Sequence, residues 1–213
     1  MRKGELFLLT SPSGTGKDTI IDRVLEGEAG RDGALWHSIS HTTRRPRSNE
    51  VEGEHYYFVD RATFEAMAAN GEFLEFAEYN ENLYGTSVRE VMPRLDRGID
   101  VILDIDVQGA EQILQRMPEA HGILVLPPSY ETLRDRLQRR GQEDAAQIAD
   151  RLAVSVWEIE RYELFGYAII NDELDLAVLA LTAIILEKRL RRDKQKDRIE
   201  TILQGFRSAV QGE

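Results

Sequence analysis

A lysine that follows two closely spaced glycines gives the chain its first recognisable chemistry. Gly14, Gly16 and Lys17 end an apolar run at residues 5–10 and precede an amphipathic run to about residue 26. A strand, a turn of small residues and a helix in this order form a phosphate-binding loop, in which backbone N–H groups surround a polyphosphate and the lysine adds a positive charge. The residues expected to form this loop are Ser11, Pro12, Ser13, Gly14, Thr15, Gly16, Lys17, Asp18 and Thr19.

Two residues of the loop differ from the usual G-x-x-x-x-G-K-[ST] pattern. Ser11 stands where the first glycine is expected, and Asp18 stands where a hydroxyl normally contacts Mg²⁺. Because a carboxylate is itself a hard oxygen ligand, Asp18 becomes the candidate metal ligand. The alternative is a glycine-rich strand-to-helix turn without a ligand. The lysine and glycines stand in register with both flanking elements, and this favours the phosphate loop.

The composition of the 213-residue chain is that of one well-packed domain. Hydrophobic residues make up 42% and charged residues 31%, which is ordinary for a soluble protein. Cysteine is absent, which excludes disulfides, thiolate metal sites and cysteine nucleophiles. The first strand begins too early to leave room for a signal peptide, and no apolar run is long enough to span a bilayer, so a cytoplasmic protein is expected.

The net charge of −11 argues against broad binding to nucleic acids or membranes. An anionic ligand must therefore be bound by local clusters of basic residues, which occur at residues 44–47, 134–140 and 188–198. The last cluster lies on a predicted helix beside several isoleucines. A solvent-exposed helix face is its default interpretation, and a contact between copies of the chain is the alternative.

Strands that alternate with helices predict a parallel sheet with ligands at the carboxyl ends of its strands. The expected strands are residues 5–10, 36–40, 56–59, 72–79, 99–105, 122–126 and 167–170, and the expected helices are residues 17–26, 61–70, 87–97, 107–116, 129–139, 145–165 and a last helix from about 172 toward the C-terminus. Residues 41–47 are expected to be irregular, and no strand is predicted at 83–86. Asp104 ends an apolar strand, where a carboxylate is costly unless it is paired.

Arginine and tyrosine side chains are concentrated in a stretch that is expected to be a small, mostly β insertion. Arg44 and Arg47, three residues apart on an irregular loop, can bind phosphate oxygens bidentately. Tyr56 and Tyr84 can add phenolic donors. The alternatives are a solvent-exposed basic loop for the arginines and ordinary packing for the tyrosines.

Five stretches of the chain resemble the guanylate kinase family in sequence and in order. They read SISHTTRRPR (38–47), GEHYYF (53–58), FLE (73–75), YGT (84–86) and ILDIDVQG (102–109). Together with the loop and three later arginines, the resemblance covers about residues 5–190. A phosphate loop alone marks a very large class of nucleotide enzymes, whereas the first of these stretches is close to a family signature.

The resemblance implies which residues bind GMP. Guanine presents two adjacent donors, N1–H and the 2-amino group, and the carboxylate of Glu75 would accept both. Adenine presents an acceptor at that point, so a buried glutamate would reject it. Taken alone, Glu75 could instead be the exposed side of an alternating strand. The implied substrate-binding residues are Ser40, Arg44, Arg47, Tyr56, Glu75, Tyr84, Thr86 and Asp104.

The resemblance also implies a lid whose arginines close over the phosphates of ATP. Arg136 and Arg140 are one helical turn apart, and Arg151 follows a polar break at residues 140–144. Such cations, with Mg²⁺, stabilise the charge that develops during phosphoryl transfer. A helix of ordinary surface arginines is the alternative. Asn171 is expected either to contact the base of ATP or to form a turn. The implied catalytic residues are Lys17, Arg44, Arg136, Arg140 and Arg151.

The predicted fold is α/β: a parallel-sheet P-loop kinase core with helices on both faces, a small, mostly β GMP-binding insertion and a helical lid. One domain is expected, divided into a core (1–37, 87–134 and 160–190), the GMP-binding insertion (38–86), the lid (135–159) and a C-terminal helical extension (191–213). The predicted reaction is ATP + GMP ⇌ ADP + GDP, with Mg²⁺ as cofactor.

Two other functions stay open at this point. One is a kinase for another small phosphorylated acceptor, which Asp18 suggests. The other is a non-catalytic guanylate-kinase-like binding module, which the presence of Lys17 and of the lid arginines argues against. The expected partners are ATP and GMP, without nucleic acid or membrane. The chain is expected to be a monomer or a homo-oligomer, with the C-terminal helix as the candidate contact.

Overall fold

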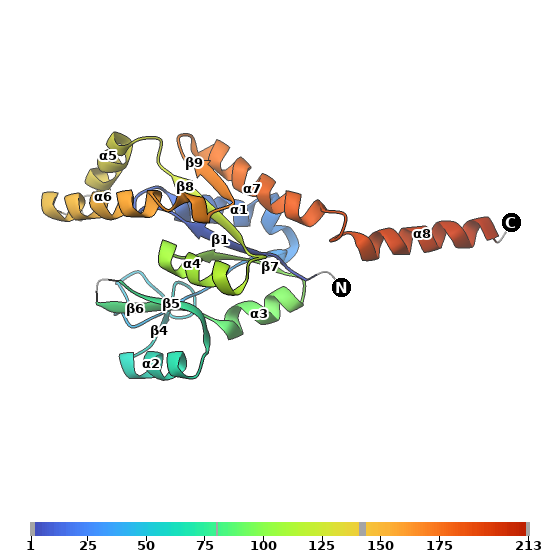
Figure 1. Ribbon diagram of the computed structural model, residues 1–213, viewed down its shortest axis with the longest axis horizontal. Coiled ribbons are helices and arrows are strands. Elements are labelled where there is room, and N and C mark those ends of the chain that lie inside the picture. The colour runs from blue at the N-terminus through green and yellow to red at the C-terminus, as the bar shows by residue number, and fades with distance from the viewer. Residues whose placement is uncertain (1–2, 80, 141–143, 212–213) are drawn as a thin grey trace.

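A five-stranded parallel sheet forms the centre of the computed structural model, which describes residues 3–79, 81–140 and 144–211 (Figure 1). In spatial order its strands are β2 (Leu35–His37), β7 (Asp100–Asp104), β1 (Leu6–Thr10), β8 (His121–Leu126) and β9 (Tyr167–Ile170). β1 lies in the middle with all its residues buried, which explains its continuous apolar sequence. Parts of the expected turn at 80–82 and of the expected polar break at 140–144 fall outside the described residues.

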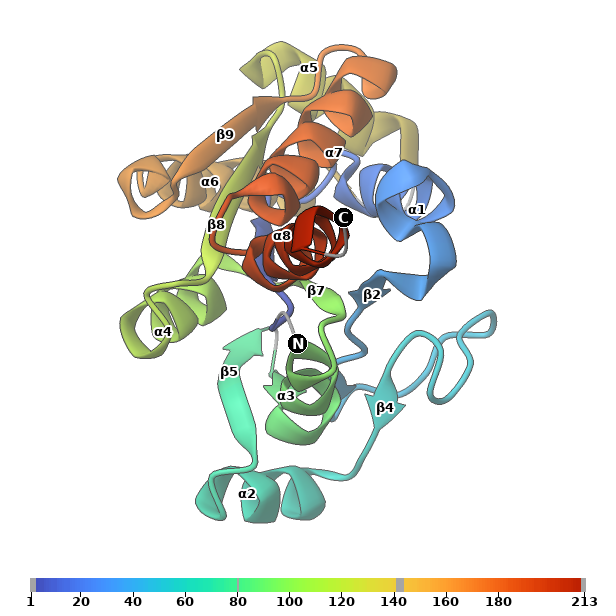
Figure 2. The same cartoon turned by 90° about the vertical axis from the view of Figure 1, so that its right-hand side faces the viewer.

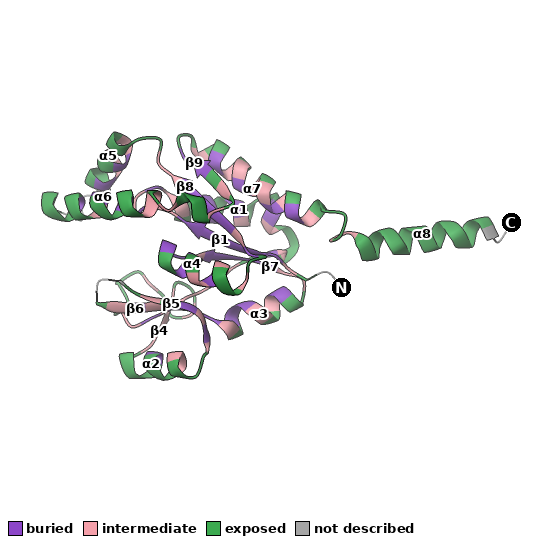
Figure 3. Ribbon diagram, in the orientation of Figure 1, coloured by how far each residue is buried: buried purple, intermediate pink, exposed green. Residues whose placement is uncertain are grey.

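The α-helices of the described residues are, in chain order, α1 (Lys17–Glu26), α2 (Arg61–Ala69), α3 (Val88–Asp96), α4 (Val107–Arg116), α5 (Tyr130–Arg140), α6 (Ala145–Ile159), α7 (Leu174–Leu190) and α8 (Lys196–Gln211). Of these, α1 and α7 cover one face of the central sheet, and α3 and α4 cover the other face. Alternate residues of β1 point to opposite faces: Phe7 and Leu9 pack with α1 and α7, and Leu6 and Leu8 pack with α3 and α4. The buried residues gather in these two layers (Figure 3). The predicted α/β class with a parallel core sheet is confirmed.

A second, four-stranded sheet lies beside the central sheet, with α2 packed on it (Figure 2). Its strands are, in spatial order, β4 (Tyr57–Phe58), β3 (His41–Thr42), β6 (Asn82–Ser87) and β5 (Phe73–Tyr79). Phe64 of α2 stacks on Phe73 of β5 with ring centroids 4.4 Å apart, and both are buried with Leu83. This small core fixes the second sheet as a separate layer.

Two strands of the second sheet differ from the sequence prediction. β3 lies within residues 41–47, which were expected to be irregular, and β6 covers residues 83–86, where no strand was predicted. β6 pairs antiparallel with both β5 and β3, so these strands are stabilised by pairing rather than by their own patterns. The strand expected at residues 36–40 is β2, which ends at His37 because the chain then leaves the central sheet for β3.

A pair of helices, α5 and α6, lies over the carboxyl edge of the central sheet. Leu133 and Leu137 of α5 pack on Ile148 and Leu152 of α6. α6 ends at Ile159 rather than at residue 165, and a short 3₁₀ turn, η2 (Tyr162–Leu164), follows it. The helix ends early because the chain turns back to pack Phe165 against the core layer of α3 and α4.

The predicted helix at the C-terminus is interrupted between α7 and α8. Arg189 donates to Asp100 at 2.6 Å and to the carbonyl of Ala34 at 3.0 Å, and Lys194 forms an ion pair with Glu5. These bonds hold the connection against the amino edge of the sheet, and α8 then projects away from the body (Figure 1). In the described part of the chain no helix is both long and apolar enough to cross a bilayer.

Candidate active site

The turn between β1 and α1 is a compact loop that depends on two glycines. Gly14 and Gly16 both have φ of 92°, a left-handed conformation that residues with a side chain rarely adopt. The hydroxyl of Thr15 donates to the carbonyl of Pro12 at 2.7 Å and closes the loop. α1 begins at Lys17, immediately after Gly16, so the N-terminal N–H groups of the helix face the space that the loop encloses.

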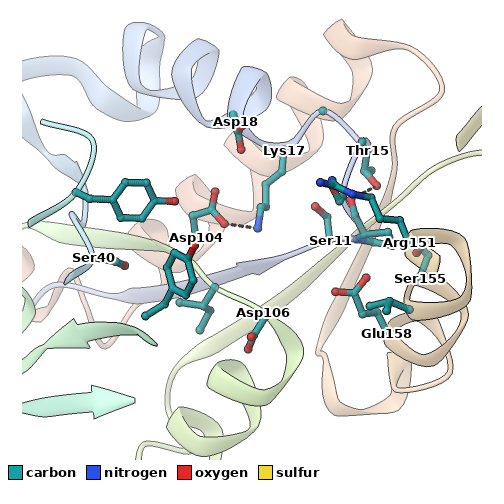
Figure 4. Close-up of a pocket in the computed structure, with 18 of the residues that line it drawn as sticks. Ser11, Thr15, Lys17, Asp18, Ser40, Asp104, Asp106, Arg151, Ser155 and Glu158 are labelled. Carbon is teal, nitrogen blue, oxygen red and sulfur yellow. Dashed lines mark hydrogen bonds and ion pairs between the residues drawn. The ribbon is translucent and has the colours of Figure 1, made fainter. Parts of the chain in front are cut away.

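A cavity of about 400 Å³ opens between this loop, the second sheet and α6 (Figure 4). Many of the predicted site residues line it together: Ser11, Pro12, Ser13, Gly14, Thr15, Gly16, Lys17, Asp18, Ser40, Arg47, Tyr56, Glu75, Tyr84, Asp104 and Arg151. Asp106, Ser155 and Glu158 also line the cavity and were not predicted. Asp106 could have been found from its place two residues after Asp104, whereas Ser155 and Glu158 carry no signal beyond their position on a predicted helix.

Asp104 is paired with the lysine of the loop. It ends β7, next to β1, and its carboxylate forms an ion pair with the Nζ atom of Lys17 (Figure 4). The side chain of Lys17 is 13% exposed and that of Asp104 is 31% exposed. The carboxylate at the end of an apolar strand is therefore neutralised, and it holds the ammonium group inside the cavity.

Glu75 is the buried acid of the second sheet. It is only 4% exposed, and its Oε1 atom accepts the N–H of Thr86 at 2.9 Å. Burial raises the pKa of Glu75 to about 7, and the negative charge of Asp106 adds to this effect. Its other oxygen lies close to Gly109 of α4, where a Cβ atom would come within 2.7 Å of it. Glu75 is thus held between β6 and α4 with its carboxylate at the cavity.

Arg44 is held by an acid that the sequence analysis missed. Its guanidinium makes two hydrogen bonds to Glu50, at 2.9 and 2.8 Å, and lies over the ring of Tyr56. The hydrogen bonds that Arg44 donates to Glu50 raise the pKa of Arg44, and Tyr84 adds to the effect. The same bonds lower the pKa of Glu50 to about 2. The available signal was an acid within a short polar loop that also carries the arginines.

The remaining predicted residues lie outside the lining of the main cavity. Thr86 is fully buried behind Glu75, with its hydroxyl 3.5 Å from that of Ser40. Thr19 and Arg136 line a second cavity of about 210 Å³ on the other side of the loop, together with Asn171. The side chain of Arg140 lies outside the described part of the structure.

Arginines from α5 and α6 reach the phosphate loop from different sides. Arg151 of α6 donates to the hydroxyl of Ser13 at 2.7 Å. Arg136 of α5 donates to the carbonyl of Thr15 at 3.2 Å. Glu158 of α6 faces the main cavity, and burial raises its pKa to about 7 although the charge of Lys17 acts to lower it (Figure 4). The two helices therefore bring two cations to the loop and one acid to the cavity.

These features define a class of protein. A parallel sheet whose first strand runs into a phosphate loop, with helices on both faces and a site at the carboxyl edge, is the architecture of P-loop nucleotide enzymes. A lid that carries arginines to the loop is typical of the members that transfer phosphoryl groups.

The comparisons with known proteins identify the family within this class. The sequence model of guanylate kinase matches residues 3–188. The guanylate kinase of Vibrio vulnificus (strain YJ016) is 47% identical over 195 residues, which cover 92% of this chain and 93% of that protein. The guanylate kinase of Escherichia coli (strain K12) is 44% identical over 203 residues, which cover 95% and 97%.

A solved structure agrees with these sequence matches. The crystal structure of guanylate kinase from Anaplasma phagocytophilum matches the fold with a TM-score of 0.73 and 31% sequence identity, over 89% of this chain and 88% of that one. The chain belongs to the guanylate kinase family and is a kinase. The resemblance seen in the sequence is confirmed.

Proposed function

We propose that this enzyme transfers the γ-phosphoryl group of ATP to GMP, giving ADP and GDP. The observation that carries the proposal is that a phosphate loop and a buried glutamate line one cavity. We assign GMP binding to the insertion 38–86, closure over ATP to the lid 135–159, and the sheet and its helices to the core (1–37, 87–134 and 160–190). ATP and GMP are cytoplasmic metabolites, so we place the reaction in the cytoplasm.

Arg44, Arg47, Tyr56 and Tyr84 would bind the phosphate of GMP. Bonds to Glu50 and to the carbonyl of Arg45 use both hydrogens on Nη1 of Arg44 and one on Nη2. Two further N–H groups of the guanidinium remain, and Tyr84 and a phosphate oxygen would share them. Glu50 therefore acts as a support that orients Arg44 while the GMP phosphate binds on its other side.

Glu75 would read the guanine base. As a carboxylate it accepts N1–H and the 2-amino group together, and this pairing favours the ionised form of a group whose pKa is raised by burial. Ser40, Thr86 and Asp104 complete the base contacts. Thr86 acts through its N–H, which holds the glutamate, and through its hydroxyl beside that of Ser40.

The phosphates of ATP would lie in the loop formed by residues 11–19, with the adenosine toward the smaller cavity. The N–H groups of the loop and the N-terminus of α1 bind the β-phosphate, and Lys17 supplies the charge beside the group in transfer. Arg136, Arg140 and Arg151 add cations from the lid. The loop, the lid and the residues that bind the GMP phosphate would then surround the phosphoryl group in transfer. Its transfer depends on positioning and charge stabilisation more than on covalent chemistry.

Mg²⁺ fits this donor set as an ion that arrives with ATP. Within residues 3–79, 81–140 and 144–211 no three acidic or histidine side chains are grouped so as to hold a metal ion by themselves. Mg²⁺ bound to nucleotide phosphates needs only one or two carboxylates and keeps several waters. Asp18, at the start of α1 and on the wall of the cavity, would hold it directly or through water. The ion would neutralise charge on the phosphates.

The test of the proposed function is GDP formation from ATP and GMP with Mg²⁺, measured by chromatography, with AMP, UMP and CMP as parallel acceptors. We expect product with GMP alone. Product with another acceptor and none with GMP would assign a different substrate. A folded protein that binds GMP and gives no product would identify a binding module.

We also propose that the C-terminal extension 191–213 joins two copies of the chain. Residues 196–210 of α8 are all exposed, and a helix in a protein is stabilised mostly by packing of its apolar face rather than by its own propensity. An apolar stripe repeats along one side at Ile199, Ile202, Leu203, Phe206 and Val210, all exposed. The same stripe on a second copy is self-complementary and would pair with it in a two-fold arrangement.

Light scattering of the full chain tests this assembly. The expected mass is about twice the 24.3 kDa of one chain. Phe206→Glu, in the stripe, should return the mass to that of one chain, whereas Ser208→Glu, on the opposite side of the helix, should not. A wild-type mass of one chain would overturn the proposal.

A further inference from the structure

Asn171 lies behind the phosphate loop rather than inside the main cavity. It follows β9 directly, and its N–H donates to the carbonyl of Leu126 at 2.8 Å, which continues the pairing of β8 and β9 by one residue. The residue is only 5% exposed. Its side-chain amide donates to the carbonyl of Thr15 at 2.7 Å, a short bond between residues 156 positions apart in the sequence.

That bond fixes the orientation of the peptide between Thr15 and Gly16. A trans peptide is planar, so its carbonyl and its N–H point in opposite directions. The carbonyl of Thr15 is turned toward Asn171 and the smaller cavity, and the N–H of Gly16 is therefore turned toward the phosphate side. In the described part of the chain this N–H makes no hydrogen bond, although it lies at the N-terminus of α1, where an anion is favoured.

Gly16 also leaves room for this contact. A Cβ atom at position 16 would lie 3.0 Å from the side-chain nitrogen of Asn171, which is tighter than a normal contact. A glycine is therefore favoured at position 16 for two reasons: the left-handed backbone conformation and the close approach of Asn171. Through these contacts Asn171 connects the end of β9 to the phosphate loop, on the side of the loop that faces away from the main cavity.

A second donor reaches the same carbonyl from the lid. Arg136 donates to Thr15 O at 3.2 Å and to the carbonyl of Asn171 at 3.0 Å. Arg136 belongs to α5, to which we assign closure over ATP, whereas the backbone of Asn171 is anchored to β8. Asn171 is therefore the donor that would stay in place if the lid opened.

We propose that Asn171 is a positioning residue that keeps the Thr15 carbonyl turned outward and so holds the N–H of Gly16 ready for a phosphate oxygen. The proposal rests on the proposed function only for the identity of the phosphate ligand as ATP. This role uses the side-chain nitrogen of Asn171 and is distinct from the expected contact with the base of ATP. A loop that is oriented before the nucleotide binds needs no reorganisation when charge develops on the phosphates.

The two roles of Asn171 predict different responses to a ligand without a base. Binding of inorganic tripolyphosphate and of ATP to the full chain would be measured by calorimetry for the wild type, Asn171→Ala and Asn171→Asp. We expect both variants to bind both ligands about tenfold more weakly, the loss expected for one hydrogen bond. Loss of ATP affinity with unchanged tripolyphosphate affinity would overturn the proposal in favour of a base contact, and unchanged affinity for both would overturn it as well.

Several controls separate positioning from a general loss of structure. The alanine variant is neutral and excludes simple charge repulsion, and the aspartate variant keeps the shape of the side chain. Glu173→Gln, an exposed neighbour, should bind tripolyphosphate like the wild type, and GMP affinity should be unchanged in all variants. In turnover, kcat should fall while KM for GMP stays constant. Tripolyphosphate binding needs no turnover, so failure of the proposed reaction leaves this test intact.

Discussion

The two ends of the cavity are built in different ways. The phosphate loop is one continuous stretch whose N–H groups and helix terminus present positive charge, and its shape depends on Gly14 and Gly16. The opposite end is a single buried carboxylate, Glu75, held by the backbone of a neighbouring strand and by the approach of α4. One end is made of backbone from a local sequence, and the other is made of side chains from distant segments.

This difference divides affinity from selectivity. Backbone N–H groups bind any phosphate of suitable shape, so the loop end supplies charge stabilisation without reading the base. Apart from the N–H of Thr86, the donors to the buried Glu75 carboxylate would come from the ligand, so in the function that we propose this end accepts only a base that presents them. Substitutions at the two ends should therefore change different kinetic parameters.

The largest effect is expected at the loop end. Lys17→Ala removes the cation beside the transferred group and should lower kcat by about 10²- to 10³-fold, because an interaction aimed at the developing charge is lost. The affinity for GMP should change little. Steady-state kinetics and GMP calorimetry measure the two separately. Lys196→Ala, an exposed lysine on α8, is the matched control, and an unchanged kcat in Lys17→Ala would refute the role of this lysine.

A smaller and more selective effect is expected at the other end. Glu75→Gln replaces one acceptor oxygen with an amide NH₂ group whose hydrogens oppose a guanine donor. kcat/KM for GMP should therefore fall about 10²-fold, the range for a hydrogen bond to a charged group. Tripolyphosphate affinity should stay at the wild-type value. Glu78→Gln removes an exposed carboxylate of the same strand and should have no effect. Equal loss of GMP and tripolyphosphate binding in Glu75→Gln would rule out the base-reading role.

The contrast also explains what the sequence could predict. The loop, β1 and the strands on both sides of β1 follow from contiguous sequence patterns. Asp104 could be predicted as a site residue because a carboxylate at the end of an apolar strand is costly unless it is paired. The roles of Arg44 and Glu75 came only with the family resemblance, since their own surroundings fit a surface loop and an exposed strand equally well.

Contacts between segments that are distant in the sequence could not be predicted from it. The ion pair of Lys17 with Asp104 joins the start of α1 to the end of β7. The support of Arg44 by Glu50 is local in sequence, but it depends on how one loop folds. β6 was missed because its partners, not its pattern, make it a strand. The end of α7 is held by the hydrogen bond that Arg189 donates to Asp100, a residue 89 positions away, and the chain breaks between α7 and α8 just after it.

The raised pKa of Glu75 predicts a pH dependence confined to one end of the cavity. Below pH 7 a growing fraction of Glu75 is protonated and cannot accept both guanine donors. GMP affinity should therefore fall with a slope that approaches tenfold per pH unit, and it should level off above pH 8. The phosphate of GMP titrates near pH 6 and adds to the loss at the acid end. Calorimetry between pH 6 and 8.5 measures the profile.

Two variants assign this profile to Glu75. Glu75→Gln should remove the part of the change centred near pH 7 and leave the part that belongs to the phosphate. Glu158→Gln should keep the full profile, although Glu158 lines the same cavity and has a similarly raised pKa. A profile that survives in Glu75→Gln and vanishes in Glu158→Gln would move the titrating group to the lid.

The smallest effect is expected from a glycine that touches no ligand. In a helix, Gly→Ala normally stabilises by about 0.5–1 kcal/mol. At Gly109 of α4 the added methyl group would come within 2.7 Å of the Glu75 carboxylate, so Gly109→Ala should displace that carboxylate and raise KM for GMP about fivefold, a fraction of the loss in Glu75→Gln.

Gly205 of α8 is the matched control, because a Cβ atom there meets nothing within 4 Å. Gly205→Ala should leave KM for GMP unchanged, and both variants should bind tripolyphosphate like the wild type. If Gly109→Ala leaves KM for GMP unchanged, α4 does not position Glu75, and the base-reading end of the cavity depends on β6 alone.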